Sequence, residues 1–293
     1  MEKRLHICFT SDTHGYLYPT DYTDTSEKEI GLMKLAASFT SDENTLILDG
    51  GDTLQGSPMT NYYYRLSPEQ QGSVMPDTSL GRNPFAAIMN ACGYQYVTLG
   101  NHDFNHGIGA LSEYLRDLRA VCLCCNIRDK AHKLPLLPWT IHTLGNGLRV
   151  GIVGACTDFV RFWEDPATVA ELEITEPVAA CRKALEEIRP LCDVTILLYH
   201  GGFERELSSR RLLTESTENQ ACRICEKLDF DLVLTGHQHV AIPPQKYGHS
   251  WVCQPPFRAA AFCELDVLRS KDGSLTVNGR NRSGCASAPT HLT

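Results

Sequence analysis

The chain has 293 residues, of which 42% are apolar and 21% charged, proportions typical of a folded globular protein that exclude disorder for most of its length. Its 27 basic and 35 acidic residues give a net charge of -8 without long blocks of one sign, which disfavours a nucleic-acid polymer as a partner. The longest apolar runs, such as Val194 to Tyr199, are far shorter than the roughly 18 residues of a membrane-spanning helix, so we expect no membrane span.

The first residues and the cysteines bear on the cellular compartment. A strand-like run, Leu5 to Phe9, follows Met1 within a few residues, with no apolar core or cleavage site of a secretion signal between them. The 13 cysteines are odd in number and many lie in apolar stretches, among them Cys8, Cys92, Cys156, Cys181, Cys192 and Cys263. Such a pattern indicates buried free thiols in a reducing compartment, so we expect a cytoplasmic protein.

In chain order, five short apolar runs are predicted to be strands. They are Leu5 to Phe9, Thr45 to Leu48, Tyr94 to Leu99, Val194 to Tyr199 and Asp231 to Leu234. Longer amphipathic segments with helix signals lie between several of them. This alternation favours an α/β architecture.

Three of the intervening segments are predicted to be helices. The first begins at Asn83-Pro84, with asparagine as the N-cap and proline in the first helical position, and ends at Cys92-Gly93. The other two span Gly109 to Leu118 and Glu176 to Ile188, the latter stopped by Pro190.

Two stretches show no clear periodicity. Residues Asn61 to Arg82 carry three tyrosines and then a passage rich in Gln, Gly, Ser and Pro, which predicts a long loop. From Ser270 the sequence becomes polar, and its last residues, Ala288 to Thr293, suggest no element. We therefore expect one domain over residues 1–269, followed over 270–293 by a polar tail or the start of a linker.

Each of the five apolar runs ends in a cluster of residues that can bind metal, with glycine beside it. The clusters are Asp12-Thr13-His14-Gly15, Gly50-Gly51-Asp52, Gly100-Asn101-His102-Asp103, His200-Gly201-Gly202 and Gly236-His237-Gln238-His239. In an α/β sheet, ligands bind outside the carboxyl ends of the strands, so topology can bring all five clusters to one place.

The spacing within the clusters also favours a shared site. Asp12 and His14 are two residues apart, which in extended backbone places both side chains on one side, and His237 and His239 repeat this spacing. The glycines would allow positive φ at a sharp strand exit, or close approach of the backbone to a metal and its phosphate. For any single histidine a hydrogen-bonded turn residue is the more common reading, but the joint pattern favours a metal site.

These five blocks, in this order, resemble the calcineurin-type metallophosphoesterase superfamily. Within it, the stretches Gly50-Gly51-Asp52-Thr53-Leu54-Gln55-Gly56-Ser57-Pro58 and Gly100-Asn101-His102-Asp103-Phe104-Asn105 are similar to the 5'-nucleotidase and 2',3'-cyclic-nucleotide phosphodiesterase family. The resemblance covers roughly residues 4 to 268. It implies a four-layered α/β/β/α sandwich and an enzyme that hydrolyses phosphoesters of nucleotides.

The resemblance also implies a ligand set for two divalent ions. One metal would be held by Asp12, His14 and His239, the second by Asn101, His200 and His237, and Asp52 would bridge both. Two carboxylates neutralise only half of the charge of two dications, which leaves positive charge for hydroxide and a phosphate oxygen. Nitrogen and oxygen ligands without thiolate suit Mn, Fe, Co, Ni or Zn.

In such a centre the ions acidify bound water toward a pKa of ~7, so that hydroxide attacks the phosphate at neutral pH. The resemblance gives His102 a catalytic role, facing the phosphate and protonating the leaving oxygen, and gives Asp103 a supporting one. Nucleotidases of the family often have Asp where this chain has Asn105, and asparagine there is compatible with the cyclic-phosphodiesterase branch.

Some motifs have other readings. The fold is also used by non-catalytic binding scaffolds, which would be expected to lose ligands, and by phosphoesterases for substrates other than nucleotides. Cys222 and Cys225 form a C-x-x-C, for which buried thiols are favoured over zinc or redox chemistry. Tyr62 to Tyr64 would stack on a base or, more commonly, pack against one another.

We expect a small phosphoester or nucleotide as the partner. Family members of the nucleotidase type generally carry a C-terminal domain that binds the base, and residues 270–293 are too few to form one. We therefore expect either a catalytic fragment, whose partner would be such a substrate-binding domain absent from this chain, or a member that never had one.

Overall fold

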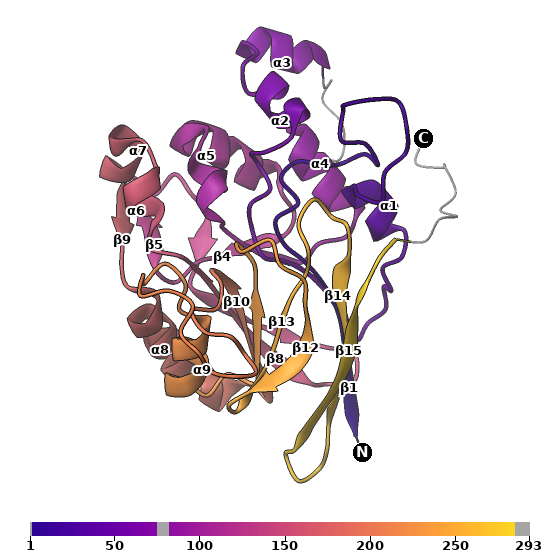
Figure 1. Ribbon diagram of the computed structural model, residues 1–293, viewed down its shortest axis with the longest axis vertical. Coiled ribbons are helices and arrows are strands. Elements are labelled where there is room, and N and C mark those ends of the chain that lie inside the picture. Colours follow the sequence, from indigo (N-terminus) through magenta and orange to yellow (C-terminus); the bar gives the residue numbers. More distant parts are fainter. Residues whose placement is uncertain (1, 75–81, 285–293) are drawn as a thin grey trace.

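The computed structural model describes residues 2–74 and 82–284 and contains two large β-sheets packed face to face, with helices on both outer faces (Figure 1). In spatial order, the first sheet of the described chain contains β15 (Leu275–Arg282), β14 (Phe262–Arg269), β1 (Lys3–Thr10), β2 (Thr45–Asp49), β3 (Tyr96–Thr98), β4 (Val121–Leu123) and β6 (Leu136–Leu137). The second contains β12 (Ile242–Tyr247), β13 (Ser250–Gln254), β11 (Leu232–Thr235), β10 (Val194–His200), β8 (Arg149–Cys156) and β7 (Trp139–Thr143).

Smaller elements complete the described chain. A separate two-stranded ribbon joins β5 (Ile127–Asp129) to β9 (Leu172–Ile174). The α-helices are α1 (Leu32–Ala36), α2 (Pro58–Tyr63), α3 (Pro68–Val74), α4 (Pro84–Ala91), α5 (Gly107–Asp117), α6 (Val160–Trp163), α7 (Pro166–Ala170), α8 (Pro177–Ile188) and α9 (Ala221–Lys227). Two short 3₁₀ helices are η1 (Asn101–Phe104) and η2 (Arg189–Leu191).

Alternation along the strands creates the layers. In β1, Leu5, Ile7 and Phe9 belong to the core between the sheets, whereas Cys8 faces the core that contains α1, α4 and α5. In β10 the same period of two sends Leu198 between the sheets and Leu197 toward α8 and α9. The three buried clusters therefore separate four layers, and the expected α/β/β/α sandwich is confirmed.

Strand direction brings the predicted clusters to one edge. β1, β2 and β3 are parallel neighbours in the first sheet, and β10 and β11 are parallel neighbours in the second. Since the carboxyl ends of parallel strands lie on the same side of a sheet, the loops after these five strands meet there.

All five predicted strands are present, with ends shifted by at most a few residues. The three predicted helices are α4, α5 and α8. The Asn83 side chain accepts hydrogen bonds from the N–H groups of Phe85 and Ala86, as an N-cap does. α8 ends at Ile188, and Pro190 lies in the following 3₁₀ turn.

The long loop predicted for residues 61–82 is wrong in part. α2 covers Asn61 to Tyr63 and α3 follows at Pro68, while residues 75–81 lie outside the described chain. The Ser57 side chain accepts a hydrogen bond from the N–H of Thr60, with Pro58 in the first turn, and Ser67 likewise precedes Pro68. Two Ser-Pro pairs thus begin helices too short to show a periodicity.

The predicted polar tail is also wrong for residues 275–282, because they form β15, which pairs antiparallel with the whole of β14. A tight turn reverses the chain: the Asp272 side chain accepts from the N–H of Ser274, and Gly273 has a φ of 90°. The expected boundary at residue 269 falls inside this hairpin, and Ala288 to Thr293 lie outside the described residues.

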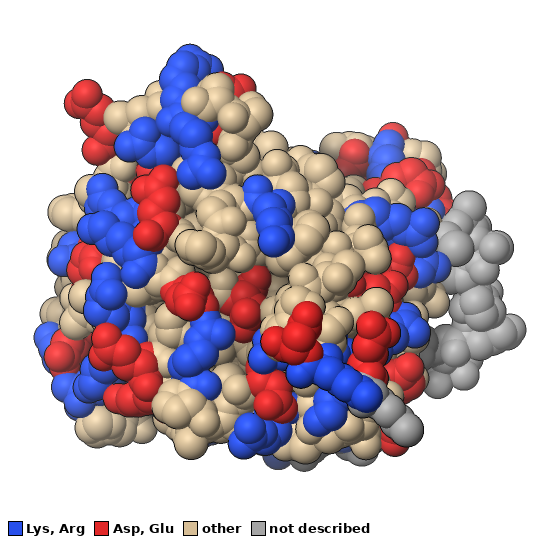
Figure 2. Space-filling view, turned by 90° about the horizontal axis from the view of Figure 1, so that it is seen from below, with Lys and Arg blue, Asp and Glu red and all other residues tan. Residues whose placement is uncertain are grey.

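The remaining expectations from composition can be compared with the described residues. Their cysteines are all free, which confirms free thiols for that part of the chain, and Cys92, Cys125 and Cys192 are only partly buried. Within that part no helix is both long and apolar enough to cross a bilayer. Figure 2, which views the molecule from below, shows acidic and basic side chains interspersed over that face.

Candidate metal centre

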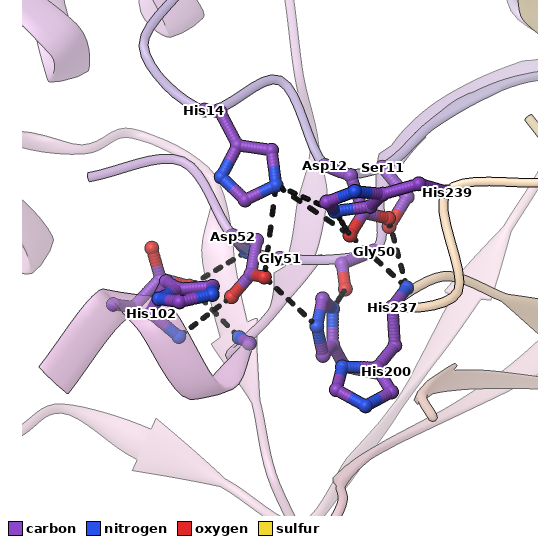
Figure 3. A network of polar contacts seen from close by, with 12 residues as sticks. Ser11, Asp12, His14, Gly50, Gly51, Asp52, His102, His200, His237 and His239 are labelled. Atoms are coloured by element: carbon purple, nitrogen blue, oxygen red, sulfur yellow. Dashed lines mark hydrogen bonds and ion pairs between the residues drawn. The ribbon is translucent and has the colours of Figure 1, made fainter. Parts of the chain in front are cut away.

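The seven predicted ligands lie in the loops or at the strand ends along one edge of the two sheets. All of them except Asn101 are labelled in Figure 3. Asp12 and His14 follow β1, Asp52 follows β2, Asn101 begins η1 after β3, His200 ends β10, and His237 and His239 follow β11. The fold therefore brings these distant segments together, as the positions of the clusters after the strands led us to expect.

Four of the seven form a compact group. Asp12, His14, Asp52 and His239 each offer one ligand atom, and these atoms all lie within 4.8 Å of one another. The Nε2 atoms of His14 and His239 are 2.8 Å apart, and His239 Nε2 lies 3.4 Å from Asp12 Oδ1. These are the residues expected for the first metal, with the expected bridging aspartate.

Backbone contacts orient two of the imidazoles. His14 Nδ1 lies 2.7 Å from the carbonyl oxygen of Gln55, and His200 Nδ1 lies 2.7 Å from that of Gly50. A carbonyl can only accept, so each Nδ1 carries a proton, and a neutral ring then presents the lone pair of Nε2 to the centre. In metal-binding histidines the ring nitrogen that does not bind the metal typically donates such a hydrogen bond.

A second group of atoms lies on the other side of Asp52. Asp52 Oδ2, Asn101 Oδ1 and His200 Nε2 are buried without a hydrogen-bond partner among the described residues. His200 Nε2 is 3.2 Å from Asp52 Oδ2, but the two atoms are not aligned as a hydrogen bond. Burying unpaired polar atoms costs free energy, so this arrangement fits a cation that would bind all three.

His237 is less clearly a ligand. Its ring lies beside that of His200, with centroids 5.4 Å apart, but its Nε2 is 2.7 Å from Glu218 Oε1. That contact leaves Nδ1 as the atom that could bind metal, so the role of the side chain stays a prediction. Its backbone N–H donates to both carboxylate oxygens of Asp12, each at 3.0 Å.

The backbone is strained where the ligands lie. Asp12, His14, Asp52, His237 and His239 have φ between 50° and 77°, a region that non-glycine residues rarely adopt. The extended backbone expected between Asp12 and His14 is therefore wrong, and left-handed turns bring them together instead. Strain of this kind, costing about 1–3 kcal/mol per residue, persists where function requires it.

Glycines give the carboxylates room. A Cβ added at Gly100 would lie 2.1 Å from Asp52 Oδ1, and one at Gly236 would lie 2.7 Å from Asp12 Oδ2. Neither glycine has a positive φ. Close approach is thus the reason for these two glycines, while five of the seven predicted ligands adopt the left-handed conformation themselves.

Two further aspartates support the centre. Asp103 accepts hydrogen bonds from the N–H groups of Gly100, Asp52, Thr53 and Leu54, contacts that suit the supporting role expected of it. Asp49 accepts from the Thr10 hydroxyl and the Gly51 N–H, and burial raises its pKa to about 7. Asp49 was not predicted from the sequence, although this residue directly precedes the second cluster.

The electrostatics of the centre favour a cation. Burial works against ionisation of Asp52, but the neighbouring histidines, His200 first and then His14 and His102, together outweigh it and hold the pKa of Asp52 below its usual range. Conversely, burial opposes protonation of His200, but Asp52, Asp12 and the Gly50 carbonyl together raise its pKa to about 10. Asp52 and His200 therefore favour each other's charged forms, and metal binding there would compete with a proton on His200.

His102 lies next to the first group without belonging to it. Its backbone N–H donates to Asp52 Oδ1 at 2.7 Å, and its ring centroid is 5.5 Å from that of His14. Its Nδ1 is 2.7 Å from Asn105 Oδ1, and Asn105 donates in turn to Glu164. Glu164 and Glu218 were missed from the sequence because they lie in segments without any motif.

Comparison with known proteins agrees with this site. Residues 5–241 match the family described as calcineurin-like phosphoesterase. The chain is 26% identical over 258 residues to the trifunctional nucleotide phosphoesterase protein YfkN of Bacillus subtilis, covering 83% of this chain and 17% of that protein. It is 24% identical to the 2',3'-cyclic-nucleotide 2'-phosphodiesterase/3'-nucleotidase of Haemophilus influenzae, covering 84% of this chain and 38% of that protein.

A solved structure extends the comparison. A Staphylococcus aureus protein, a candidate 5'-nucleotidase crystallised with alpha-ketoglutarate, superposes with a TM-score of 0.85 at 27% identity, covering 97% of this chain and 55% of that one. The chain thus spans 17% and 38% of the two curated relatives and about half of this structure.

Proposed function

This chain belongs to the calcineurin-like phosphoesterase family, and on that basis we propose that it is a hydrolase of nucleotide phosphoesters that uses two divalent metal ions. It would act as a 5'-nucleotidase, a 2',3'-cyclic-nucleotide 2'-phosphodiesterase or both. The main support is the set of ligand atoms that converge at the strand ends, three of them buried without a hydrogen-bond partner in the described part of the chain.

Asp12, His14 and His239 would hold the first ion, and Asn101, His200 and His237 the second. Asp52 would lie between them, because its Oδ2 is 3.9 Å from His14 Nε2 and 3.2 Å from His200 Nε2. When bound, the ions would stabilise the charge of the phosphate oxygens and make a bound water more acidic.

The chain's own residues contribute orientation and a proton. The carbonyls of Gln55 and Gly50 keep His14 and His200 turned with Nε2 toward the centre. His102 is the side chain beside the metal ligands that would face the phosphate and give a proton to the leaving oxygen. Asp52 anchors it by accepting its backbone N–H.

Nucleotides are proposed as substrates because the relatives are named for acting on them. The metal ligands and His102 would contact only the phosphate, which every candidate substrate shares. Of the three tyrosines considered for base stacking, Tyr63 is buried and Tyr64 stacks on His106 at 4.2 Å, whereas Tyr62 is 61% exposed. We therefore expect poor discrimination among bases by this chain.

A substrate panel tests the proposal. The chain would be loaded with Mn²⁺, its metal content measured, and phosphomonoesters, 2',3'-cyclic nucleotides and phosphodiesters offered as substrates. We expect hydrolysis of 5'-mononucleotides or 2',3'-cyclic nucleotides that stops on chelation. Hydrolysis of non-nucleotide phosphoesters alone would overturn the substrate class. Full metal content without hydrolysis would instead identify a binding scaffold.

A further inference from the structure

A chain of hydrogen bonds leads away from the metal centre through His102. His102 Nδ1 lies 2.7 Å from Asn105 Oδ1, and Asn105 Nδ2 donates to Glu164 Oε1. His102 and Asn105 belong to one turn, but Glu164 comes from another segment and follows α6. We call His102, Asn105 and Glu164 the relay. Its third member therefore reaches the site only through the tertiary fold.

The carboxylate decides how the other two groups are oriented. An ionised carboxylate can only accept, so the Asn105 amide must direct its NH₂ toward Glu164 and its oxygen toward His102. That oxygen also only accepts, so His102 must carry a proton on Nδ1. A neutral His102 is thereby fixed as one tautomer with Nε2 unprotonated, so the proton that it would give to the leaving oxygen is one that Nε2 takes up to form the imidazolium. Asparagine alone could flip and accept a hydrogen bond from either tautomer.

The position of Glu164 follows from the helix that it ends and from one stacking contact with the site. The Glu164 N–H donates to the carbonyl of Val160 at 3.0 Å, and the neighbouring Trp163 stacks on His237 with ring centroids 5.5 Å apart. Glu164 is partly buried and has no ion pair with a lysine or arginine of the described chain. Its charge is thus directed to Asn105 rather than to a surface cation.

We propose that Glu164 is a positioning residue for His102, acting through Asn105 to fix the imidazole tautomer and ring orientation beside the metal centre. Nucleotidases of the family often have an aspartate at the position of Asn105, next to the histidine. In this chain Glu164 would supply the carboxylate instead, and it would act on His102 through Asn105. The effect of this positioning on catalysis rests on the proposed function, whereas the tautomer of His102 can be tested without it.

The first test reads the tautomer itself. Histidine-labelled chain loaded with Zn²⁺, which is diamagnetic, would be studied by ¹⁵N NMR at alkaline pH. We expect the wild type to show His102 protonated on Nδ1, and Glu164→Ala to show a mixture of tautomers or the other one. An unchanged Nδ1 proton in Glu164→Ala would overturn the proposal. This result does not depend on any activity, so it remains decisive if no substrate is hydrolysed.

The second test exchanges the carboxylate of Glu164 and the amide of Asn105 between the two positions. Glu164→Ala should lower kcat by about 10–100-fold with little change in KM, the range typical of partners that orient a site residue. Asn105→Asp alone would set two carboxylates against each other and should also be impaired. In the double variant Asn105→Asp/Glu164→Gln, an amide again donates to a carboxylate, and kcat should recover to within about tenfold of wild type.

The matched control is Glu171→Gln, the same chemical change at an exposed ion pair with Lys133, which should leave kcat unchanged. A double variant no better than Asn105→Asp would contradict the relay, as would loss of Zn²⁺ from Glu164→Ala, which would mean that Glu164 supports the ligands instead.

Discussion

Two pairs of carboxylates in this molecule have opposite surroundings. Glu264 and Asp266 lie on β14, where each acid meets arginines of the same chain. Arg4 contacts Asp266 at 2.5 Å, and Arg280 and Arg282 contact Glu264 at 3.0 and 2.6 Å. These two acids therefore have their counter-charges within the fold.

At the strand ends the situation is reversed. Asp12 and Asp52 are each only 1% exposed, and in the described chain their charged neighbours are histidines rather than lysine or arginine. A buried charge without a partner is costly, whereas an exposed ion pair contributes little either way. The chain thus supplies the cations at β14, whereas the carboxylates at the strand ends have no lysine or arginine partner in the described chain, which fits the proposed metal site.

The largest expected effect is at Asp52. Asp52→Asn keeps the size of the side chain but removes the charge shared by both groups of ligands, and Asp52→Ala removes the side chain as well. We expect either variant to lose activity by more than about 10²-fold. This is a larger loss than the change of about 10–100-fold that is typical of residues that only hydrogen-bond to a metal ligand. The measurement is kcat at verified metal content, and Asp266→Asn is the matched control on β14. A variant that kept a tenth of wild-type turnover with full metal content would show that Asp52 is not the bridging ligand.

The next effect concerns His102, which lies beside the ligands. His102→Ala should lower turnover by about 10²–10⁴, the usual range for a positioned acid, and leave metal content unchanged. The defect should shrink with a nitrophenyl ester, because nitrophenolate scarcely needs a proton to leave. Metal loss would make His102 a ligand or a structural support, and an undiminished defect with the nitrophenyl ester would favour charge stabilisation over proton donation.

Metal removal should destabilise the fold, because it leaves the buried atoms of the strand ends without a cation. At a free metal concentration of 100 times Kd, one site stabilises the native state by about 2.7 kcal/mol. We expect chelation to lower Tm by several degrees, and the shift to be much smaller in Asp52→Asn. Equal Tm values for loaded and chelated wild type, at confirmed metal content, would mean that the strand ends are not organised around metal.

The same contrast explains which parts of the structure could be predicted from sequence. The strand-end clusters can be recognised because Asp12, Asp52 and His200 follow closely on apolar runs, and sheet topology then places them together. The left-handed backbone at residues such as Asp12, His14 and Asp52 could not be predicted, since it depends on contacts between loops, such as the hydrogen bond from the His14 N–H to the Asp52 carbonyl.

What the sequence could not indicate depends on tertiary contacts. β15 is polar and was expected to be a tail, because its pairing with β14 and the arginine pairs with Glu264 are invisible in a linear reading. Glu164 reaches His102 only through Asn105, which lies 59 residues earlier in the chain, and Glu218 reaches His237 from a loop 19 residues before it. Short capped helices such as α2 were missed because a periodicity needs more than six residues to be recognised.

The smallest effect should be at Asp266, and it tests the other side of the comparison. Burial tends to raise the pKa of Asp266, but hydrogen bonds from His6 and Arg4 outweigh it and lower the pKa below its usual value. A lowered carboxyl pKa stabilises the native state above the pKa of the unfolded chain, and this contribution is lost as pH falls through the folded pKa. Because the Asp266 side chain is 43% exposed, solvent screens the pair and Asp266→Asn should cost less than about 1 kcal/mol at neutral pH.

Urea denaturation of wild type and Asp266→Asn over a range of pH measures this contribution. The difference in unfolding free energy should disappear in strong acid, where both side chains are neutral. A loss above about 2 kcal/mol, or one that persists in acid, would mean that the β14 carboxylates depend on a cation as strongly as those of the strand ends. The distinction between the two regions would then fail, because burial at the strand ends would no longer set Asp12 and Asp52 apart.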